Sequence, residues 1–143
     1  MIQKIDEFRG KYFFLSNFYE IPVTYDGITY LNNEAAFQAM KTKNLEQRKK
    51  FATLDPSSAK RKGRRGIILR NDWEDVKEQY MYEICLAKFT QNKDLKMKLI
   101  ATAPAVLEEG NTWGDREWGT VSGVGKNKLG KILMRIRDEL SKE

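Results

Sequence analysis

Apolar residues recur at steps of three and four along several stretches of the chain, which is the spacing of an amphipathic helix. The clearest stretch follows Asp72, a good N-cap residue, and predicts a helix that ends near Phe89. Its apolar positions are Trp73, Val76, Tyr80, Ile84 and Ala87. A second stripe predicts the last helix of the chain, with Leu129, Ile132, Leu133, Ile136 and Leu140 on one face.

Shorter patterns predict four further helices. The first is expected to begin at Asn32 or Asn33, either of which can cap exposed amide groups, and to end near Thr42. The others are expected over residues 45–53, 57–65 and 93–102.

Strand signals lie near the N-terminus. Residues 22–25 and 28–30 flank Asp26-Gly27, a dipeptide that favours a tight hairpin turn because it tolerates positive φ. Residues 5–15 are apolar and aromatic, and we expect them to include a strand. No internal repeat or linker interrupts the chain. The expected fold is therefore α+β: a single helix-rich domain over residues 1–143 with a small antiparallel sheet.

Composition restricts the chemistry that such a domain could perform. The chain has no histidine, which excludes Ser-His-Asp and Cys-His catalysis as well as zinc sites that contain histidine. Its single cysteine, Cys85, excludes an internal disulfide and a cysteine-rich metal site, and its place in a predicted helix favours a core role. An enzyme of this composition must transfer protons through carboxylates, lysine, tyrosine or water.

The net charge is +6, which favours anionic partners such as phosphates, nucleotides or nucleic acid, although solubility alone is an equal alternative. No apolar run reaches the roughly 20 residues that span a bilayer, and the first residues lack a signal-peptide pattern. We therefore expect a cytoplasmic protein without a membrane partner. The sequence carries no indication of an oligomeric state.

Two segments in the first third carry more polar specificity than packing requires. Ser16 and Asn17 interrupt an aromatic run, either as a capped turn or as a polar contact to a ligand between aromatic walls. On the helix that follows, Glu34, Gln38 and Lys41 fall at i, i+4 and i+7 and share one stripe. This stripe is either a solvated face with weak ion pairs or an acid, an amide and an amine that project into a cleft.

Two later segments are also candidates for ligand binding. Residues 60–66 are a basic run with glycines, which suits either a solvated surface, a phosphate clamp or nucleic-acid binding. Residues 108–119 combine two tryptophans with four acids and are punctuated by glycine, so they predict a loop in which Asp115 could lie beside an indole.

Taken in order, these motifs resemble the NADAR family, which includes the YbiA-like N-glycosidases. The resemblance extends from about residue 8 to residue 137. The matching elements are Phe8-Arg9-Gly10, Leu15-Ser16-Asn17-Phe18, Tyr30, Glu34-Ala35-Ala36-Phe37-Gln38-Ala39-Met40-Lys41, Gly63-Arg64, Trp73, Lys88-Phe89, Asn111-Thr112-Trp113-Gly114-Asp115, Trp118-Gly119, Gly125-Lys126-Asn127-Lys128-Leu129-Gly130, Leu133-Met134 and Arg137. In many relatives a histidine follows the helix glutamate, and this chain has Ala35 there.

The resemblance implies a metal-independent, cofactor-free hydrolase that cleaves an N-glycosidic bond at ribose C1′. The implied substrates are riboflavin-pathway ribosylamino-pyrimidine phosphates or ADP-ribosyl compounds, including ADP-ribose attached to guanine, either free or in nucleic acid. Such cleavage develops oxocarbenium character on the sugar, which nearby carboxylates stabilise.

We therefore assign Glu34 and Asp115 as a carboxylate pair. Lys41 is assigned as a phosphate or ribose contact, or as an amine that attacks an opened sugar. The expected substrate-binding residues are Trp113 and Trp118 on the base, Asn17 and Asn127 on the ribose, Arg9 and Arg64 on phosphate, and in addition Gly10, Ser16, Phe18, Gln38 and Gly119. Two alternatives remain: a module that binds ADP-ribose or another nucleotide without hydrolysing it, and a nucleic-acid-binding protein that uses residues 60–65.

Overall fold

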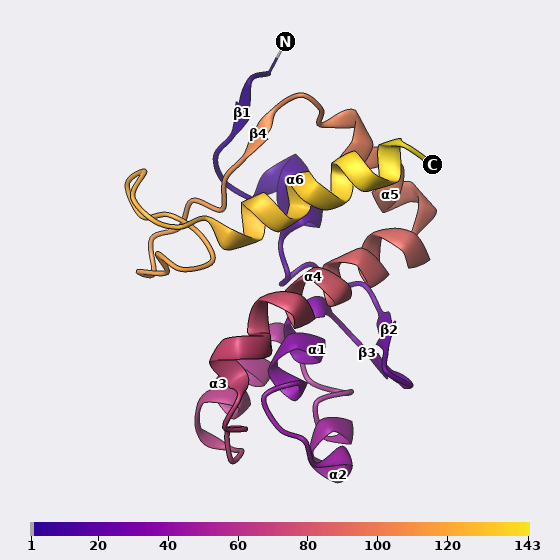
Figure 1. Ribbon diagram of the computed structural model, residues 1–143, viewed down its shortest axis with the longest axis vertical. Helices are drawn as coiled ribbons and strands as arrows, with labels where there is room; N and C mark the ends of the chain where they lie inside the picture. Colours follow the sequence, from indigo (N-terminus) through magenta and orange to yellow (C-terminus); the bar gives the residue numbers. More distant parts are fainter. Residues whose placement is uncertain (1) are drawn as a thin grey trace. The chain divides into compact units, whose positions relative to one another are not determined.

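The computed structural model describes residues 2–143, which form two compact units. Unit 1 contains residues 2–16 and 92–143, and unit 2 contains residues 17–91. The expected helix-rich fold with a small sheet is confirmed (Figure 1). Within residues 2–143, no helix has both the length and the apolar character needed to cross a bilayer.

Unit 2 begins with the predicted hairpin. β2 (Val23–Tyr25) and β3 (Ile28–Tyr30) pair antiparallel, with Val23 opposite Tyr30. Asp26 and Gly27 both have positive φ, 52° and 83°, as a two-residue turn of this kind requires.

Four helices complete unit 2: α1 (Asn33–Ala39), α2 (Leu45–Lys49), α3 (Pro56–Arg65) and α4 (Trp73–Gln91). Each of the first three begins after a side chain that accepts a hydrogen bond from a backbone amide, namely Asn32, Asn44 and Asp55. α1 ends three residues before the predicted Thr42, and α2 ends at Lys49 rather than near residue 53. α1 packs against both α3 and α4, so every one of its residues is buried.

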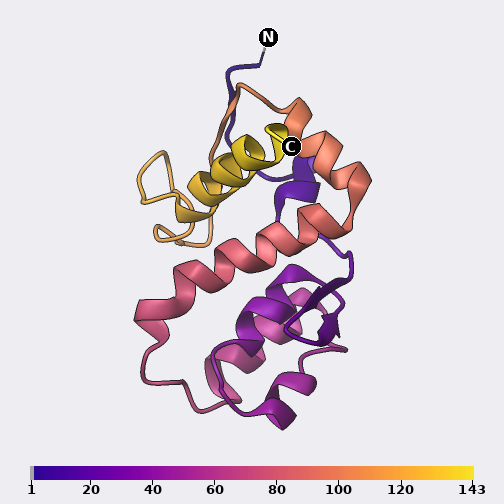
Figure 2. The same ribbon diagram turned by 45° about the vertical axis from the view of Figure 1, so that its right-hand side comes forward.

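Unit 1 pairs the two ends of the chain. β1 (Lys4–Ile5) runs parallel to β4 (Val106–Leu107), and α5 (Lys93–Ala101) packs against α6 (Lys128–Ser141), as both views show (Figure 2). The strand expected within residues 5–15 is confirmed only at Ile5, because Gly10–Leu15 forms a 3₁₀ helix, η1. The antiparallel expectation holds for β2 and β3, whereas β1 and β4 are parallel.

α4 carries a lysine inside the core of unit 2. The Lys88 side chain is almost fully buried, at 1% exposure, with Nζ 5.5 Å from the Tyr19 ring centroid and 5.1 Å from that of Phe89. Burial lowers the pKa of this amine to about 8 because the charged form loses its hydration. One turn earlier, Cys85 is also buried, in agreement with its predicted core role, and burial raises the pKa of its thiol to about 12.

The lowered pKa of Lys88 gives the protein a specific pH dependence of stability. Between pH 8 and 10 the unfolded chain, with an ordinary lysine pKa of 10.5, binds more protons at this site than the folded chain. We therefore expect this site to raise the free energy of unfolding by about 2 kcal/mol over that range. Urea unfolding at pH 8, 9 and 10 should show the rise in the unmodified protein and its loss in Lys88→Met. The control Lys50→Met, at an exposed position, should keep the rise in the free energy of unfolding with pH. If that free energy changed with pH in the same way in all three proteins, a lowered pKa of Lys88 would be contradicted.

Candidate active site

α1 brings an acid and an amide together inside unit 2. Gln38 Nε2 donates a hydrogen bond of 2.7 Å to Glu34 Oε2, across the i, i+4 spacing noted in the sequence. Glu34 is 8% exposed and Gln38 is 5% exposed, so the pair is not part of a solvated ladder of ion pairs. Glu34 is further fixed by its backbone amide, which donates to the Asn17 carbonyl at 3.1 Å. The result is a carboxylate held in one orientation.

The pair depends on a close approach between α1 and α3. A Cβ atom added at Gly63 of α3 would overlap Gln38 Oε1, which is buried without a hydrogen-bond partner. The only residue type that leaves this space empty is glycine. Gly63 therefore sets the position of Gln38 and, through it, that of the Glu34 carboxylate.

Lys41 follows the end of α1 and lies among several charges. Its Nζ is 6.0 Å from the centroid of the Trp73 ring. Burial lowers the pKa of this amine, and the positive charges of Arg64, Lys60 and Lys77 lower it further, while Glu34 opposes them. Lys77 is itself buried and pairs with Glu74, Nζ to Oε1, at 2.6 Å. Residues of α3 and α4 thus place positive charge near the Lys41 amine, and Glu34 of α1 places negative charge there.

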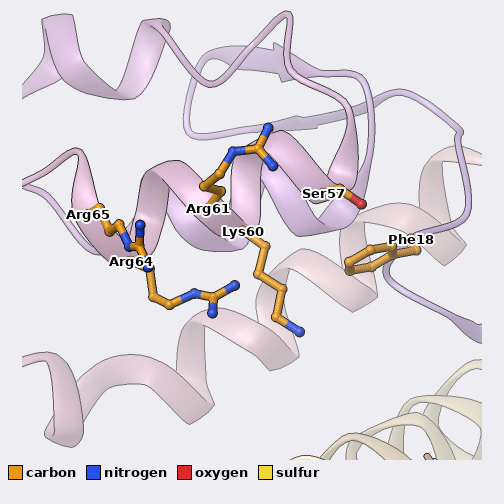
Figure 3. A pocket seen from close by; sticks show the side chains of 6 residues that line it. All are labelled: Phe18, Ser57, Lys60, Arg61, Arg64 and Arg65. Carbon is orange, nitrogen blue, oxygen red and sulfur yellow. The ribbon is translucent and has the colours of Figure 1, made fainter. Parts of the chain in front are cut away.

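An open pocket of about 360 Å³ lies along α3 (Figure 3). Its lining consists of Phe18, Ser57, Lys60, Arg61, Arg64 and Arg65. Lys60 and Arg64, one turn apart, extend on the same side of the helix, and Lys60 Nζ is 5.9 Å from the Phe18 ring centroid. Of the residues that the structure describes, no acidic one lines this pocket. An anion is the ligand that such a lining favours.

Asn17, expected to bond a ribose, uses its side chain inside the protein. Its Nδ2 donates to Met81 Sδ at 3.3 Å, and its Oδ1 accepts from Asn33 Nδ2 at 3.1 Å. The residue is buried, so its observed role is to join the start of unit 2 to α1 and α4.

Unit 1 presents the second set of predicted site residues in the loop that precedes α6. Asp115 Oδ1 accepts hydrogen bonds from the backbone amides of Glu117 at 3.0 Å and Trp118 at 2.9 Å. The Asn111 side chain makes two hydrogen bonds to the backbone of Asp115: its Oδ1 accepts from the Asp115 amide at 3.1 Å and its Nδ2 donates to the Asp115 carbonyl at 2.9 Å. One oxygen of the Asp115 carboxylate is therefore committed to shaping the loop.

The predicted substrate-binding residues of this loop differ in how far they are exposed or already hydrogen-bonded within the protein. Trp113 is 56% exposed, whereas Trp118 is half-buried with Lys128 Nζ 5.8 Å from its ring centroid. Asn127 has both side-chain polar atoms engaged, because Oδ1 accepts from the Glu109 amide at 3.0 Å and Nδ2 donates to the Leu107 carbonyl at 2.9 Å. Gly119 packs so tightly that a Cβ would overlap the Glu109 carbonyl.

The predicted residues therefore divide between the units. Unit 2 holds Asn17, Phe18, Glu34, Gln38, Lys41 and Arg64; unit 1 holds Arg9, Gly10, Ser16, Trp113, Asp115, Trp118, Gly119 and Asn127. Lys60 and Asn111 lie in the two segments, residues 60–66 and 108–119, that the sequence marked as candidates for ligand binding, but neither was assigned a role of its own. Lys77 was missed, and its place near Lys41 becomes evident only in the fold. Across residues 2–143, no three aspartate, glutamate or cysteine side chains form a group that could hold a metal ion.

Comparison with known proteins gives consistent matches. The NADAR domain matches residues 6–141. N-glycosidase YbiA of Escherichia coli strain K12 is 43% identical over 131 residues, which cover 90% of this chain and 81% of that protein. A riboflavin biosynthesis protein of Vibrio vulnificus is 36% identical over 130 residues, covering 89% of this chain and 35% of that protein. The NMR structure of Escherichia coli YbiA matches with a TM-score of 0.87 and 40% identity, covering 99% of this chain and 88% of that one.

The contact between Gly63 and Gln38 makes a specific prediction. Gly63→Ala should displace Gln38, break its hydrogen bond to Glu34 and lower stability by about 1–3 kcal/mol through overpacking. The matched control is Gly66→Ala, just after the same helix, where a new Cβ would lie 3.0 Å from Lys62 Cγ and 3.1 Å from the Lys62 carbonyl oxygen and would overlap neither. Thermal unfolding of the two variants checks the prediction, and equal melting temperatures would contradict it.

Proposed function

The chain belongs to the NADAR family, and on this premise we propose that it hydrolyses the C1′–N bond of a phosphorylated ribosyl compound. The protein is a hydrolase that acts on N-glycosyl bonds, like the relatives named N-glycosidase that align with about 90% of it. The proposed substrate is a riboflavin-pathway ribosylamino-pyrimidine phosphate or an ADP-ribosyl group attached to a base such as guanine. The first choice is supported by the name of the Vibrio relative.

The observation that carries the proposal is the position of a buried carboxylate beside cationic groups in unit 2. Glu34 is oriented by Gln38, and the charges of Glu34, Lys60 and Arg64 all act on the Lys41 amine. A phosphate on the substrate would be held by Arg64 and Lys60, whose side chains line the α3 pocket. The sugar attached to that phosphate would then lie near the carboxylate.

The reaction adds water across the C1′–N bond. As the bond breaks, positive charge develops on C1′ and the ring oxygen, and a carboxylate at Glu34 stabilises it. The leaving nitrogen takes a proton, and a water oxygen bonds to C1′ and releases a proton. We propose Glu34 and Asp115 as the two carboxylates, one for the sugar and one for the proton transfers. Neither step requires an imidazole, in keeping with a chain that contains no histidine.

Lys41 is proposed to act in one of two ways. As a cation it would bind phosphate or a ribose oxygen. As a neutral amine it would attack C1′ of the opened sugar, the C1′–N bond would break and the base would leave as its amine, and water would then hydrolyse the Schiff base and free Lys41. Its lowered pKa enlarges the fraction of neutral amine at a given pH, which the second role needs.

The remaining residues are proposed to bind the substrate. Trp113 and Trp118 would stack on the base, Arg9 would bind phosphate, and Gly10, Ser16, Phe18 and Gly119 would complete the site. Asn17 and Asn127 already use their side-chain amides within the protein. For these two we propose a supporting role in place of the direct ribose contact expected from the sequence.

The proposal is tested by mass-spectrometric detection of the released base. The protein would be incubated separately with a ribosylamino-pyrimidine phosphate, ADP-ribose, NAD and ADP-ribosylated guanosine. We expect release from one of them, and a loss of about 10²- to 10⁴-fold in kcat for Glu34→Gln and for Asp115→Asn. If both variants keep near-normal turnover, the carboxylate assignment is wrong. Ligand binding without base release from any substrate would instead support the non-catalytic binding module.

The role of the α3 pocket is tested by kinetics. Arg64→Ala should raise KM by about 10- to 100-fold, because the loss of a charge-assisted hydrogen bond costs about 1.5–3 kcal/mol, with a smaller effect on kcat. The charge-matched control Lys49→Ala removes an exposed cation of α2 that pairs with Glu46 and does not line the pocket. A KM that changes equally in the two variants would show that only the net charge of the protein matters.

A further inference from the structure

The backbone just after α1 is held by two arginines. Carbonyl groups at the end of a helix lack partners within the helix and must find others. Here the Met40 carbonyl accepts from Arg70 Nη1 at 3.3 Å, and the Lys41 carbonyl accepts from the Arg70 backbone amide at 2.8 Å. The next carbonyl, of Thr42, accepts from Arg48 Nε at 2.8 Å. Three consecutive carbonyls centred on Lys41 are thus fixed from outside their own helix.

The Arg70 side chain is itself held in place by several interactions. Its Nε donates to Asp72 Oδ1 at 2.6 Å and its Nη2 donates to Asp72 Oδ2 at 3.0 Å, which forms a two-pronged ion pair. Its Nη1 also donates to Tyr80 Oη at 2.9 Å, and the guanidinium carbon lies 5.3 Å from the Tyr80 ring centroid. The Arg70 side chain is only 8% exposed. The guanidinium therefore has little freedom to leave the Met40 carbonyl.

The same arginine supports the surface on which the Lys41 amine lies. The Trp73 backbone amide donates to the Arg70 carbonyl at 3.3 Å. The centroid of the Trp73 ring is 6.4 Å from that of Tyr80 and 5.1 Å from that of Phe37. Lys41 Nζ lies over this indole. Both ends of Lys41, its backbone and its amine, are thus connected to residues that Arg70 holds.

We propose that Arg70 is a positioning residue for Lys41, which it places against Trp73 and beside Glu34 in the geometry that the reaction needs. This inference rests on the proposed function. Arg70 is not proposed to contact the substrate, because its guanidinium group already donates to Asp72, Tyr80 and the Met40 carbonyl. The charged groups that face the Lys41 amine are Glu34 from α1, Lys60 and Arg64 from α3, and Lys77 from α4.

Kinetics of Arg70→Lys and Arg70→Ala test the proposal. Lysine keeps the positive charge but cannot make two hydrogen bonds to Asp72 and one to the Met40 carbonyl at once, so we expect kcat of Arg70→Lys to fall about 10-fold. For Arg70→Ala we expect kcat to fall by up to about 100-fold, since a 1 Å misplacement of a catalytic group can cost about that much. KM should change less than threefold, because Lys60 and Arg64 remain. We expect the pH profile of kcat to contain a limb that reports the Lys41 amine and is therefore lost in Lys41→Met. In the Arg70 variants this limb should move to higher pH, since a loosened Lys41 amine is better hydrated.

The control is Arg137→Ala, which removes a comparable arginine. Arg137 Nη1 donates to the Ala105 carbonyl at 2.7 Å and to Thr102 Oγ1 at 3.1 Å, so its loss costs stability without touching residues 40–42. A shifted pH limb in the Arg70 variants and an unshifted one in Arg137→Ala support the proposal. An unshifted limb in Arg70→Lys, or kinetic losses equal to those of Arg137→Ala, overturn it. If Arg70→Ala does not fold, Arg70→Lys decides alone.

A second measurement separates this inference from the proposed function. Competitive acetylation of lysines across the pH range, read by peptide mass spectrometry, gives the pKa of Lys41 in the protein without any substrate. A rise in that pKa in Arg70→Lys, absent in Arg137→Ala, supports positioning even if no base release is ever found. An unchanged pKa overturns positioning even if the protein proves to be an active N-glycosidase.

Discussion

The contact between α1 and α3 is the constraint on which the candidate site depends. Every residue of α1 is buried, so no face of this helix is exposed to solvent. The contact is close because α3 has no side chain at Gly63, and the space is filled by the Gln38 amide. Gln38 in turn orients Glu34. The packing that builds the core of unit 2 is therefore also the packing that aims the carboxylate.

The charges around this contact are unbalanced in a way that suits an anionic ligand. The charges of Lys60, Arg64 and Lys77 act on the Lys41 amine, and the charge of Glu34 opposes them there. Like charges held near one another repel, and a bound phosphate would offset that repulsion. The fold of unit 2 supports this arrangement because α3 supplies Lys60 and Arg64, α4 supplies Lys77, and Lys41 follows the end of α1.

Those features of the fold that arise from local patterns could be predicted from the sequence. The β2–β3 hairpin follows from Asp26-Gly27, α3 from its cap at Asp55, and α4 and α6 from long apolar stripes. The parallel pair of β1 and β4 could not be predicted, because each strand has two residues and the pair joins segments about a hundred residues apart. The end of α1 was placed three residues late because the carbonyls of residues 40–42 find their donors in Arg48 and Arg70, which is a tertiary effect.

The candidate site shows the same division between local and tertiary information. The spacing of Glu34 and Gln38 predicted a shared face, and the structure joins them by a hydrogen bond. Asn17 and Asn127 were expected to face a ligand, yet a short amide side chain near a turn is also the group that best satisfies backbone or core polar atoms. Arg70 stands between Leu69, which is exposed, and Asn71 in the sequence, and nothing local marks it as the support of Lys41.

The lining of the α3 pocket also determines how acidification would act on a ligand held there. The pocket offers ammonium and guanidinium groups, and imidazole, the side chain that ordinarily titrates between pH 5 and 8, is absent from the chain. A phosphate monoester changes its own charge near pH 6, whereas the bridging diphosphate of an ADP-ribosyl group has no ionisation in that range. Weaker binding below pH 6 would then report the ligand's ionisation rather than the protein's. The protein would in this way discriminate terminal from bridging phosphate by the pH of its surroundings, with no change in its own structure.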